Sequence, residues 1–327
     1  MGYRNALPFE EAELRVWLES EYNVVVEQLT VQSGYMGTVV FVDTSTERYV
    51  LKCVPNAEGL RERLLAQTVL LDHLKVEGVP VATCVIARNQ NLIFVVDDNL
   101  LFMSTFLVGD GFVPQFRPQI TAAGRTLGRL HRVALNWQNM GDTIPSLGWS
   151  GWVSQLKFEW GILASSCVEG RALVNCLEGA LEQWVVPRET ERSIVIHNDF
   201  RAQNLVFKDH VVSGVFDFDA VCLAPRIFDV AYSLIFFQAV VADHPFDESE
   251  MCDFYRAYQQ EFPIELDAQS DLSAWLGLAL LRGLTLWGRI AYVDCVNLKP
   301  KVWIARYLPL LERIDQIATK LQSTSAG

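Results

Sequence analysis

The sequence predicts an α+β protein of two lobes, and three observations support this fold class. The chain has 327 residues, of which 50% are hydrophobic, so it can bury a substantial core and exceeds the usual size of one domain. Its N-terminal third carries short β-branched and aromatic runs between turn residues, as strands do. Most of the rest carries apolar residues at helical spacing. We therefore expect an N-lobe over 1–107, with an antiparallel sheet, and a mainly helical C-lobe over 108–327.

The N-lobe is expected to begin with an amphipathic helix over 8–22, where Leu14, Trp17 and Leu18 stand among acidic residues. Leucines at helical spacing predict a second helix over 60–77. Apolar runs separated by glycines and short polar turns predict five strands, over 24–31, 38–43, 49–54, 81–86 and 92–96.

The C-lobe is expected to combine helices with short strands that form hairpins. Three apolar runs predict strands over 193–196, 204–207 and 211–216. Helical periodicity predicts helices over 120–133, 152–167, 170–184, 229–242, 248–262, 272–292 and 301–322.

Composition narrows the function classes. The formal net charge is −12 and the sequence has no clustered run of Lys and Arg, which argues against a nucleic-acid surface. An acidic chain tolerates cationic substrates, but negative charge is also an ordinary route to solubility. The seven cysteines include no Cys-x-x-Cys pair and are expected to be reduced thiols.

No membrane segment is expected. The N-terminus lacks the apolar stretch of a signal peptide. The longest apolar candidate, 272–287, is interrupted by Arg282 and is shorter than the about 20 residues that span a bilayer. We expect a cytoplasmic protein without membrane or nucleic-acid partners, and its oligomeric state is not indicated by the sequence.

The strongest functional signal is the segment 197–204, His-Asn-Asp-Phe-Arg-Ala-Gln-Asn, which a predicted hairpin separates from Phe-Asp-Phe-Asp at 216–219. This spacing suits phosphoryl transfer, because Asp199 would orient the attacking hydroxyl and Arg201 would neutralise phosphate charge. Asn204 and Asp217 would bind Mg²⁺. The alternative is a chance match with Asp217 as a turn residue, but two motifs in the correct order favour a kinase.

These motifs resemble the aminoglycoside phosphotransferase and choline kinase superfamily, which includes type II homoserine kinases and is related to the protein kinases. The resemblance covers nearly the whole chain, and Phe-Asp-Val-Ala-Tyr at 228–232 matches a later signature of the family. It implies a protein-kinase-like fold with ATP and Mg²⁺ as cofactors. It also implies Asp199 as the catalytic base, Asn204 and Asp217 as metal ligands, and Asp229 as a residue that braces the catalytic loop.

The resemblance implies nucleotide contacts in the N-lobe. Ser33, Gly34 and Gly37 lie in a turn whose glycines would let backbone amides approach phosphate oxygens, although an ordinary hairpin explains the glycines equally well. Lys52 lies within an apolar strand and would bind the α- and β-phosphates. The alternative for Lys52 is an outward-facing strand residue.

A kinase lysine is usually held by a glutamate on the following helix, and here Gln67 stands at that position. Gln67 can donate or accept a hydrogen bond but cannot neutralise Lys52. Glu62, one or two turns earlier, is the other candidate, and the sequence does not choose between them.

The segment 101–110 resembles the strand and hinge between kinase lobes, where backbone groups contact adenine. Phe102, Ser104 and Phe106 are therefore expected to border the nucleotide, with a plain buried strand as the alternative. His131 ends the predicted helix 120–133 and is expected to have a structural role rather than to act as a base.

Secondary assignments complete the site. Asp219 would join a metal through water or would be a solvent-facing turn acid, and Arg201 could instead pair with Asp229 or Asp219. Tryptophans and acids of the C-lobe could line an acceptor pocket, but as a rule tryptophans are core residues and helix acids are solvated. These residues are Trp149, Trp152, Trp160, Trp275, Trp287, Trp303, Asp243, Asp247, Glu248, Glu250 and Asp253.

The sequence thus predicts an ATP-dependent small-molecule kinase, a phosphotransferase with an alcohol group as acceptor. The acceptor would be an amino sugar or aminoglycoside, an amino alcohol, or a homoserine-like compound. A pseudokinase that binds nucleotide without transfer is an alternative because of Gln67. A protein Ser/Thr kinase is disfavoured because no activation segment with Ala-Pro-Glu follows Asp217. A metal-dependent hydrolase is disfavoured by the lack of a His/Asp ligand cluster.

Overall fold

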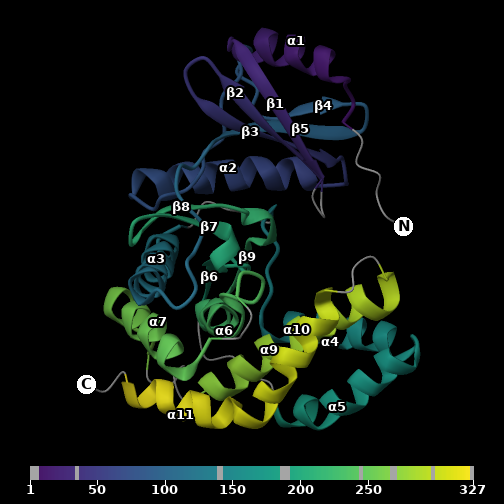
Figure 1. Ribbon diagram of the computed structural model, residues 1–327, viewed down its shortest axis with the longest axis vertical. Helices are drawn as coiled ribbons and strands as arrows, with labels where there is room; N and C mark the ends of the chain where they lie inside the picture. The colour runs from purple at the N-terminus through teal and green to yellow at the C-terminus, as the bar shows by residue number, and fades with distance from the viewer. Residues whose placement is uncertain are drawn as a thin grey trace. The chain divides into compact units, whose positions relative to one another are not determined.

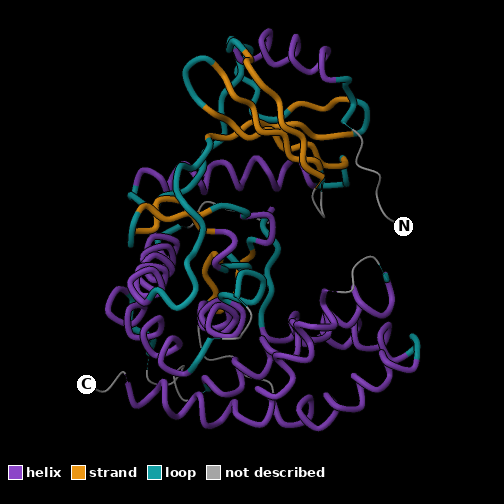
Figure 2. Tube along the Cα trace, viewed as in Figure 1, coloured by secondary structure: helices purple, strands orange, loops and turns teal. Residues whose placement is uncertain are grey.

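The computed structural model describes residues 7–33, 37–137, 143–184, 192–242, 246–265, 271–295 and 299–324. The chain forms two compact units, Met1–Val108 with Met140–Ile144, and Gly109–Asn139 with Pro145–Gly327. The division after Val108 lies one residue beyond the predicted boundary. The N-terminal unit holds an antiparallel sheet and the C-terminal unit is mainly helical (Figures 1 and 2), as the predicted α+β class requires.

The N-terminal unit is a five-stranded antiparallel sheet with a helix on each face (Figure 1). The strand order is β1-β2-β3-β5-β4. The helix α1 begins with a capping box between Glu10 and Glu13, which satisfies backbone donors of its first turn. The elements are α1 Glu11–Tyr22, β1 Val26–Ser33, β2 Thr38–Thr44, β3 Arg48–Pro55, α2 Leu60–Val76, β4 Phe94–Val96 and β5 Asn99–Thr105.

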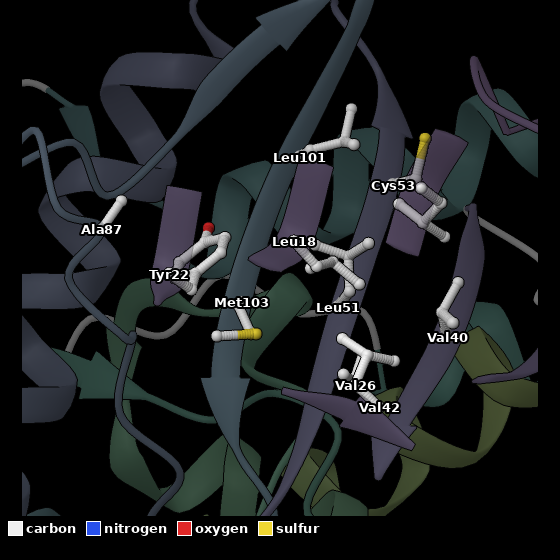
Figure 3. Close-up of a cluster of buried hydrophobic side chains, with 11 residues drawn as sticks. Leu18, Tyr22, Val26, Val40, Val42, Leu51, Cys53, Ala87, Leu101 and Met103 are labelled. Atoms are coloured by element: carbon white, nitrogen blue, oxygen red, sulfur yellow. The ribbon is translucent and has the colours of Figure 1, made fainter. Parts of the chain in front are cut away.

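Alternation along the strands assigns each side chain to one face of this sheet. Leu51 and Cys53 of β3 pack with Leu18 and Tyr22 of α1 and with Met103 of β5 (Figure 3). The even positions point the other way, where Val54 and Phe102 pack with Leu64 of α2. Position 52 of β3 therefore belongs to the α2 face.

One predicted strand of this unit is wrong. The segment 81–86 forms only isolated bridges, such as Cys84 opposite Ser104. The N–H of Val81 donates to the carbonyl oxygen of Val79 at 2.9 Å, a local turn around Pro80 that draws the backbone away from a regular ladder. The fifth strand of the sheet is β5, most of which the sequence assigned to the hinge.

The C-terminal unit packs its helices around α9. Within the described residues five helices, α4, α5, α6, α10 and α11, contact α9, and α3 packs along α7. Two short antiparallel pairs, β6 with β9 and β7 with β8, carry the loops of the predicted site. The elements are α3 Arg117–Leu135, α4 Trp149–Ala164, α5 Val168–Trp184, β6 Ser193–Ile196, β7 Leu205–Lys208, β8 Val211–Val215, β9 Cys222–Pro225, α6 Arg226–Phe236, α7 Glu248–Glu261, α9 Leu272–Arg289, α10 Lys299–Tyr307 and α11 Ile314–Thr324.

Two further predictions for this unit need correction. The single helix expected over 301–322 is broken into α10, a 3₁₀ segment Leu308–Arg313 and α11, because Pro309 has no N–H and cannot continue an α-helix. The helix expected over 229–242 begins three residues earlier and ends at Phe236. The strand β9, which pairs with β6, was not predicted.

Within the described residues, one helix, Leu272–Asp294, is long and apolar enough to cross a membrane by length and composition alone. Of its most apolar window, 67% is buried inside the protein. The core helix of a protein can be equally long and apolar, and α9 is the helix around which the C-terminal unit packs.

Candidate functional site

The predicted catalytic residues lie in two neighbouring loops of the C-terminal unit. The first loop follows β6 and carries Asp199, and the second follows β8 and carries Asp217. The N–H of Phe216 donates to the carbonyl oxygen of Asn204 at 3.0 Å, and Nε2 of His197 donates to the carbonyl oxygen of Phe216 at 3.1 Å. These bonds join the two loops. Asp199 and Asp217 both follow the ends of strands, as predicted.

The carboxylate of Asp199 is held by three side chains. Arg201 forms an ion pair with it, Nε to Oδ1 at 2.7 Å, and donates from Nη2 to Oδ2 at 2.8 Å. Asn204 donates from Nδ2 to Oδ2 at 2.9 Å, and the hydroxyl of Tyr232 donates to Oδ1 at 3.0 Å. Charge-assisted bonds of this kind are short and strong. The orientation of Asp199 is therefore fixed before any substrate binds.

Arg201 pairs with Asp199 rather than with Asp229 or Asp219, the partners considered from the sequence. Burial acts to lower the pKa of Arg201, but the nearby Tyr232 and Asp199 outweigh it, so the pKa is raised above its ordinary value. Burial raises the pKa of Tyr232 to about 12. Both groups therefore stay protonated around neutral pH and remain hydrogen-bond donors.

Asn204 presents its side-chain oxygen for a further ligand. Its Nδ2 donates to the backbone oxygen and to Oδ2 of Asp199, at 2.8 and 2.9 Å. No bond to its Oδ1 is given by the described residues, although the side chain is buried, with 4% of its surface exposed. An amide oxygen in this situation suits Mg²⁺, which prefers oxygen ligands.

Asp217 adopts a left-handed backbone conformation, with φ of 64° and ψ of 59°. Asp and Asn tolerate this region better than most residues, and strained positions of this kind cluster at functional sites. Asp219 follows in the 3₁₀ turn Phe218–Ala220 and is half-buried. Asp217, Asp219 and Asn204 thus carry side-chain oxygens in the two loops that are bonded to each other beside Asp199.

Asp229 holds the catalytic loop through hydrogen bonds to its backbone, as the sequence suggested. It is fully buried and accepts hydrogen bonds from the backbone N–H groups of His197 and Asn198, at 2.9 and 3.0 Å. Its Oδ2 also lies 3.0 Å from Nε2 of His131, whose Nδ1 contacts the hydroxyl of Tyr258 at 3.0 Å. His131 is fully buried, so its structural role is confirmed, whereas its link to Asp229 was not predicted.

Three residues that hold the loop were not found from the sequence: Asn198, Tyr232 and Arg282. Asn198 has a positive φ of 63° and donates from Nδ2 to the carbonyl oxygen of Ala220 at 2.9 Å. Arg282, from α9, donates from Nη1 to Oδ1 of Asn198 at 3.1 Å. Tyr232 is the last residue of the Phe-Asp-Val-Ala-Tyr motif, and its place in this motif is the sequence feature that could have indicated a role at the site.

In the N-terminal unit, Lys52 lies on β3 opposite Phe102 of β5 and on the sheet face that α2 covers. Gln67 points into the buried face of α2, with 7% of its surface exposed, and its Oε1 has no hydrogen-bond partner among the described residues. Glu62 is exposed. The described contacts therefore show no bond from Lys52 to Oε1 of Gln67.

The proposed phosphate loop is only partly described. Ser33 ends β1 and pairs with Thr38 of β2, and Gly34 lies outside the described residues. A Cβ at Gly37 would collide with the carbonyl oxygen of Cys53, so close packing against β3 already requires glycine there.

The proposed adenine-binding positions lie on β5 or directly after it. Ser104 donates to the carbonyl oxygen of Val50 at 3.3 Å. The N–H of Phe106 donates to the carbonyl oxygen of Arg48 at 3.3 Å, and the Arg48 guanidinium lies 4.7 Å from the Phe106 ring centroid. These two residues and Phe102 therefore lie where β5 pairs with β3, inside the sheet.

The acids that the sequence offered for a cationic acceptor have structural partners. Asp247 caps α7 and accepts from the N–H of Glu250 at 2.8 Å. Asp243 lies outside the described residues. The ion pairs are Glu248 with Arg313 and Lys320, and Asp253 with Arg117 and Arg256.

Most of the tryptophans are core residues, with Trp149, Trp152, Trp275 and Trp287 buried. Across the described part of the chain, no group of three or more His, Cys, Asp or Glu residues gathers in a way that could hold a metal.

Comparisons with known proteins agree on the family. The family model described as "Phosphotransferase enzyme family" matches residues 27–268. A homoserine kinase of Zymomonas mobilis subsp. mobilis is 24% identical over 266 residues, which are 78% of this chain and 77% of that protein.

Two solved structures confirm the kinase-like fold. An amicoumacin kinase in complex with AMP-PNP and Ca²⁺ matches with a TM-score of 0.72 at 16% identity and covers 94% of each chain. A microcompartment-associated aminopropanol kinase matches with a TM-score of 0.66 at 17% identity over 96% of this chain and 99% of that one.

The family match extends over most of the chain and includes both catalytic-loop motifs and the brace residue Asp229. The chain therefore belongs to the phosphotransferase enzyme family, and the predicted enzyme class, a phosphotransferase with an alcohol group as acceptor, is confirmed.

Proposed function

We propose that this protein transfers the γ-phosphoryl group of ATP to a hydroxyl group of a small molecule. The observation that carries the proposal is the environment of Asp199, whose carboxylate is oriented by Arg201, Asn204 and Tyr232 beside the loop of Asp217. The acceptor oxygen would form a bond to the γ-phosphorus while the bond from that phosphorus to the β,γ-bridging oxygen breaks. The hydroxyl proton would pass to Asp199, and ADP would leave.

Mg²⁺ would be held by Oδ1 of Asn204 and by the carboxylate of Asp217 together with phosphate oxygens of the nucleotide. The metal supplies charge neutralisation during transfer. Two protein oxygens are sufficient, because Mg²⁺ at kinase sites is usually bound by one or two side chains plus substrate phosphates. Asp219 would contribute through a water molecule.

Arg201 would change partner during the reaction. A carboxylate offers about four lone-pair sites. At Asp199 three of them accept hydrogen bonds, from Nη2 of Arg201, Nδ2 of Asn204 and the hydroxyl of Tyr232, and Nε of Arg201 forms an ion pair with Oδ1. If Arg201 turns to a phosphate oxygen, Asp199 regains capacity to accept the acceptor hydroxyl. Arg201 would therefore neutralise negative charge on the transferred phosphoryl group, in addition to orienting Asp199.

The N-terminal unit would bind the nucleotide. Lys52 would contact the α- and β-phosphates, and the turn with Ser33, Gly34 and Gly37 would approach phosphate through its backbone. Phe102, Ser104 and Phe106 would border adenine, and Gln67 would support Lys52. This assignment makes residues 1–107 the nucleotide-binding lobe and residues 108–327 the catalytic and acceptor-binding lobe of a cytoplasmic enzyme.

The acceptor would be a hydroxyl compound of metabolite or antibiotic size. The names of the relatives cover homoserine, aminopropanol and amicoumacin, so the family likeness favours small alcohols without choosing one. A nucleotide-binding module without transfer is the second candidate, because Gln67 stands where the family usually carries a glutamate, and its Oε1 has no hydrogen-bond partner among the described residues.

The decisive experiment measures Mg²⁺-ATP-dependent ADP formation with a panel of aminoglycosides, amino alcohols, hydroxy amino acids and sugars. We expect one class to stimulate ADP formation, and Asp199→Asn to lower kcat by about 100-fold or more because general-base catalysis contributes that much. Asp253→Asn, which changes a carboxylate of α7 that pairs with Arg117 of α3, is the matched control and should retain activity. ATP binding without stimulation by any acceptor would instead support the nucleotide-binding module.

A further inference from the structure

Arg282 of α9 lies beside the catalytic loop, stacked on aromatic rings. Its guanidinium carbon is 4.4 Å from the ring centroid of Trp152 and 5.6 Å from that of Tyr232. Its Nη1 donates to Asn198, the residue before Asp199, while the hydroxyl of Tyr232 donates to Asp199 itself. Arg282 therefore contacts two residues that adjoin the proposed base: Asn198 precedes Asp199 in the chain, and Tyr232 is hydrogen-bonded to it.

The charge of Arg282 is only partly compensated. Among the described residues Arg282 forms the hydrogen bond to Asn198 and no ion pair, and burial lowers its pKa. Arg289, one heptad further along α9, shows the usual arrangement, because it pairs with the carboxylate of Glu159 at 2.7 Å. The carboxylates of Asp199 and Asp229 act on this charge from nearby, but neither forms an ion pair with the guanidinium among the described residues. A cation withdrawn from water is stabilised further when an anion pairs with it directly.

An unsatisfied hydrogen-bond donor lies next to Arg282. Trp152 is stacked on Phe228 with ring centroids 4.3 Å apart and has 1% of its surface exposed. Its indole Nε1 has no hydrogen-bond partner among the described residues. A buried donor without an acceptor is destabilising, so the indole N–H of Trp152 lacks an acceptor directly beside the guanidinium of Arg282.

From this geometry we propose that Arg282 binds the carboxylate of the acceptor, and that the acceptor is therefore a hydroxy acid such as a hydroxy amino acid. Stacking uses the flat faces of the guanidinium, and Nη1 is bonded to Asn198, so the remaining N–H groups of its edge are left for a carboxylate. The same charge repels polycationic amino sugars. The inference rests on the proposed function, since the hydroxyl of the acceptor has to reach Asp199.

The test compares pairs of alcohols that differ only by the carboxylate. These pairs are L-homoserine with 3-aminopropan-1-ol, L-serine with ethanolamine, and L-threonine with 1-aminopropan-2-ol. The wild-type protein should prefer one of the acids by about 10- to 100-fold in kcat/KM over its counterpart, the range that a charged hydrogen bond supplies. Arg282→Gln should raise KM for that acid by a similar factor while leaving KM for the counterpart within about threefold.

Two further variants control for structural effects. Arg282→Lys keeps the positive charge but lacks the planar fork, so its KM for the acid should lie between those of the wild type and Arg282→Gln. Arg289→Gln removes an arginine from the same helix away from the loop and should leave the preference for the acid unchanged. Thermal unfolding of all variants checks that each is folded.

The possible failures are distinguishable. If Arg282→Gln lowers kcat by the same factor for both members of a pair, Arg282 only positions Asn198 and the proposal is wrong. Preference for an alcohol without a carboxylate also overturns it while leaving the kinase intact. If no alcohol is phosphorylated, titration of tryptophan fluorescence with the three acids measures binding alone. Absence of Arg282-dependent binding there rejects the proposal, whereas its presence supports the acceptor site and rejects only the transfer reaction.

Discussion

At the scale of single residues, Tyr232 offers the most direct check on how Asp199 is oriented. Tyr232→Phe removes the hydroxyl that donates to Oδ1 of Asp199 but keeps the ring beside Arg282. Loss of one hydrogen bond to a charged group is worth about 1.5 kcal/mol or more, so we expect kcat to fall by about 10-fold with little change in KM. Steady-state ADP formation measures both values.

The pH dependence of this variant follows from the pKa of Tyr232, which burial raises from 10.0 to about 12. A raised tyrosine pKa means that the folded state favours the neutral hydroxyl, so the stabilisation is complete below pH 10 and is lost as the pH rises towards 12. Between pH 6 and 9 the kcat profiles of the wild type and Tyr232→Phe should therefore run parallel. Tyr49→Phe, which removes a surface bond to Glu47, is the control. A new ionisation in that interval, or unchanged kcat, would contradict the role given to Tyr232.

Sequence distance decides which site residues can be predicted. Asp199, Arg201 and Asn204 lie within one short motif, so their spacing alone indicates a common site. Tyr232 meets Asp199 from 33 positions away, and Arg282 meets Asn198 from 84 positions away. Such contacts depend on how α6 and α9 pack against the loop, and nothing in the local sequence records that packing.

At the scale of elements, close packing between α3 and α7 positions the brace beneath the catalytic loop. Gly124 faces the backbone of Phe254, and a Cβ at this position would overlap its carbonyl oxygen. The contact lets His131 of α3 reach both Tyr258 of α7 and Asp229. Gly124→Ala should push the helices apart and lower the free energy of unfolding by about 1–3 kcal/mol, the usual cost of overpacking.

Urea denaturation of Gly124→Ala tests this packing, and Gly161→Ala provides a matched helical control. Gly161 lies on the exposed side of α4, where an added Cβ meets nothing within 4 Å. Alanine is the better helix former, so this variant should gain about 0.5–1 kcal/mol. Equal effects of the two substitutions would show that helix propensity, rather than the approach of α3 to α7, governs position 124.

The elements also show where sequence patterns stop being informative. Helical periodicity located α7 closely because it buries one apolar face, and a long apolar run located α9, which is buried on most sides. The run 81–86 has strand-like composition, yet the turn at Pro80 leaves it with isolated bridges. The short strand β9 is defined by its pairing with β6, and pairing of distant segments is not encoded in either one alone.

At the scale of the whole molecule, the two units follow directly from composition and pattern. Strand-forming runs are confined to the N-terminal third, apart from the short hairpins that carry the catalytic loops, and this distribution predicts a sheet unit followed by a helical one. The net charge of −12 suggested tolerance of cationic acceptors. The surroundings of Arg282 oppose that suggestion, because the local charge next to Asp199 matters more to an acceptor than the total.

Nucleotide binding should be visible in the stability of the whole protein. A ligand that binds only the folded state, present at 100 times its Kd, adds about 2.7 kcal/mol to the free energy of unfolding. For a chain of this length such a gain raises Tm by about 5 °C. We therefore expect Mg²⁺-ATP, or Mg²⁺ with a non-hydrolysable analogue, to raise Tm by this amount in a thermal-shift experiment.

The metal ligands make the same experiment specific. Asp217→Asn removes the carboxylate proposed for Mg²⁺ and should abolish most of the shift, as should EDTA added to the wild type, because phosphate charge near the carboxylates is then no longer neutralised. Asp253→Asn should keep the full shift, since its carboxylate pairs with Arg117 and Arg256 and contacts neither catalytic loop in the described residues. If Asp217→Asn retained the wild-type shift and its dependence on Mg²⁺, the metal would be bound elsewhere, and the role assigned to the loop after β8 would be wrong.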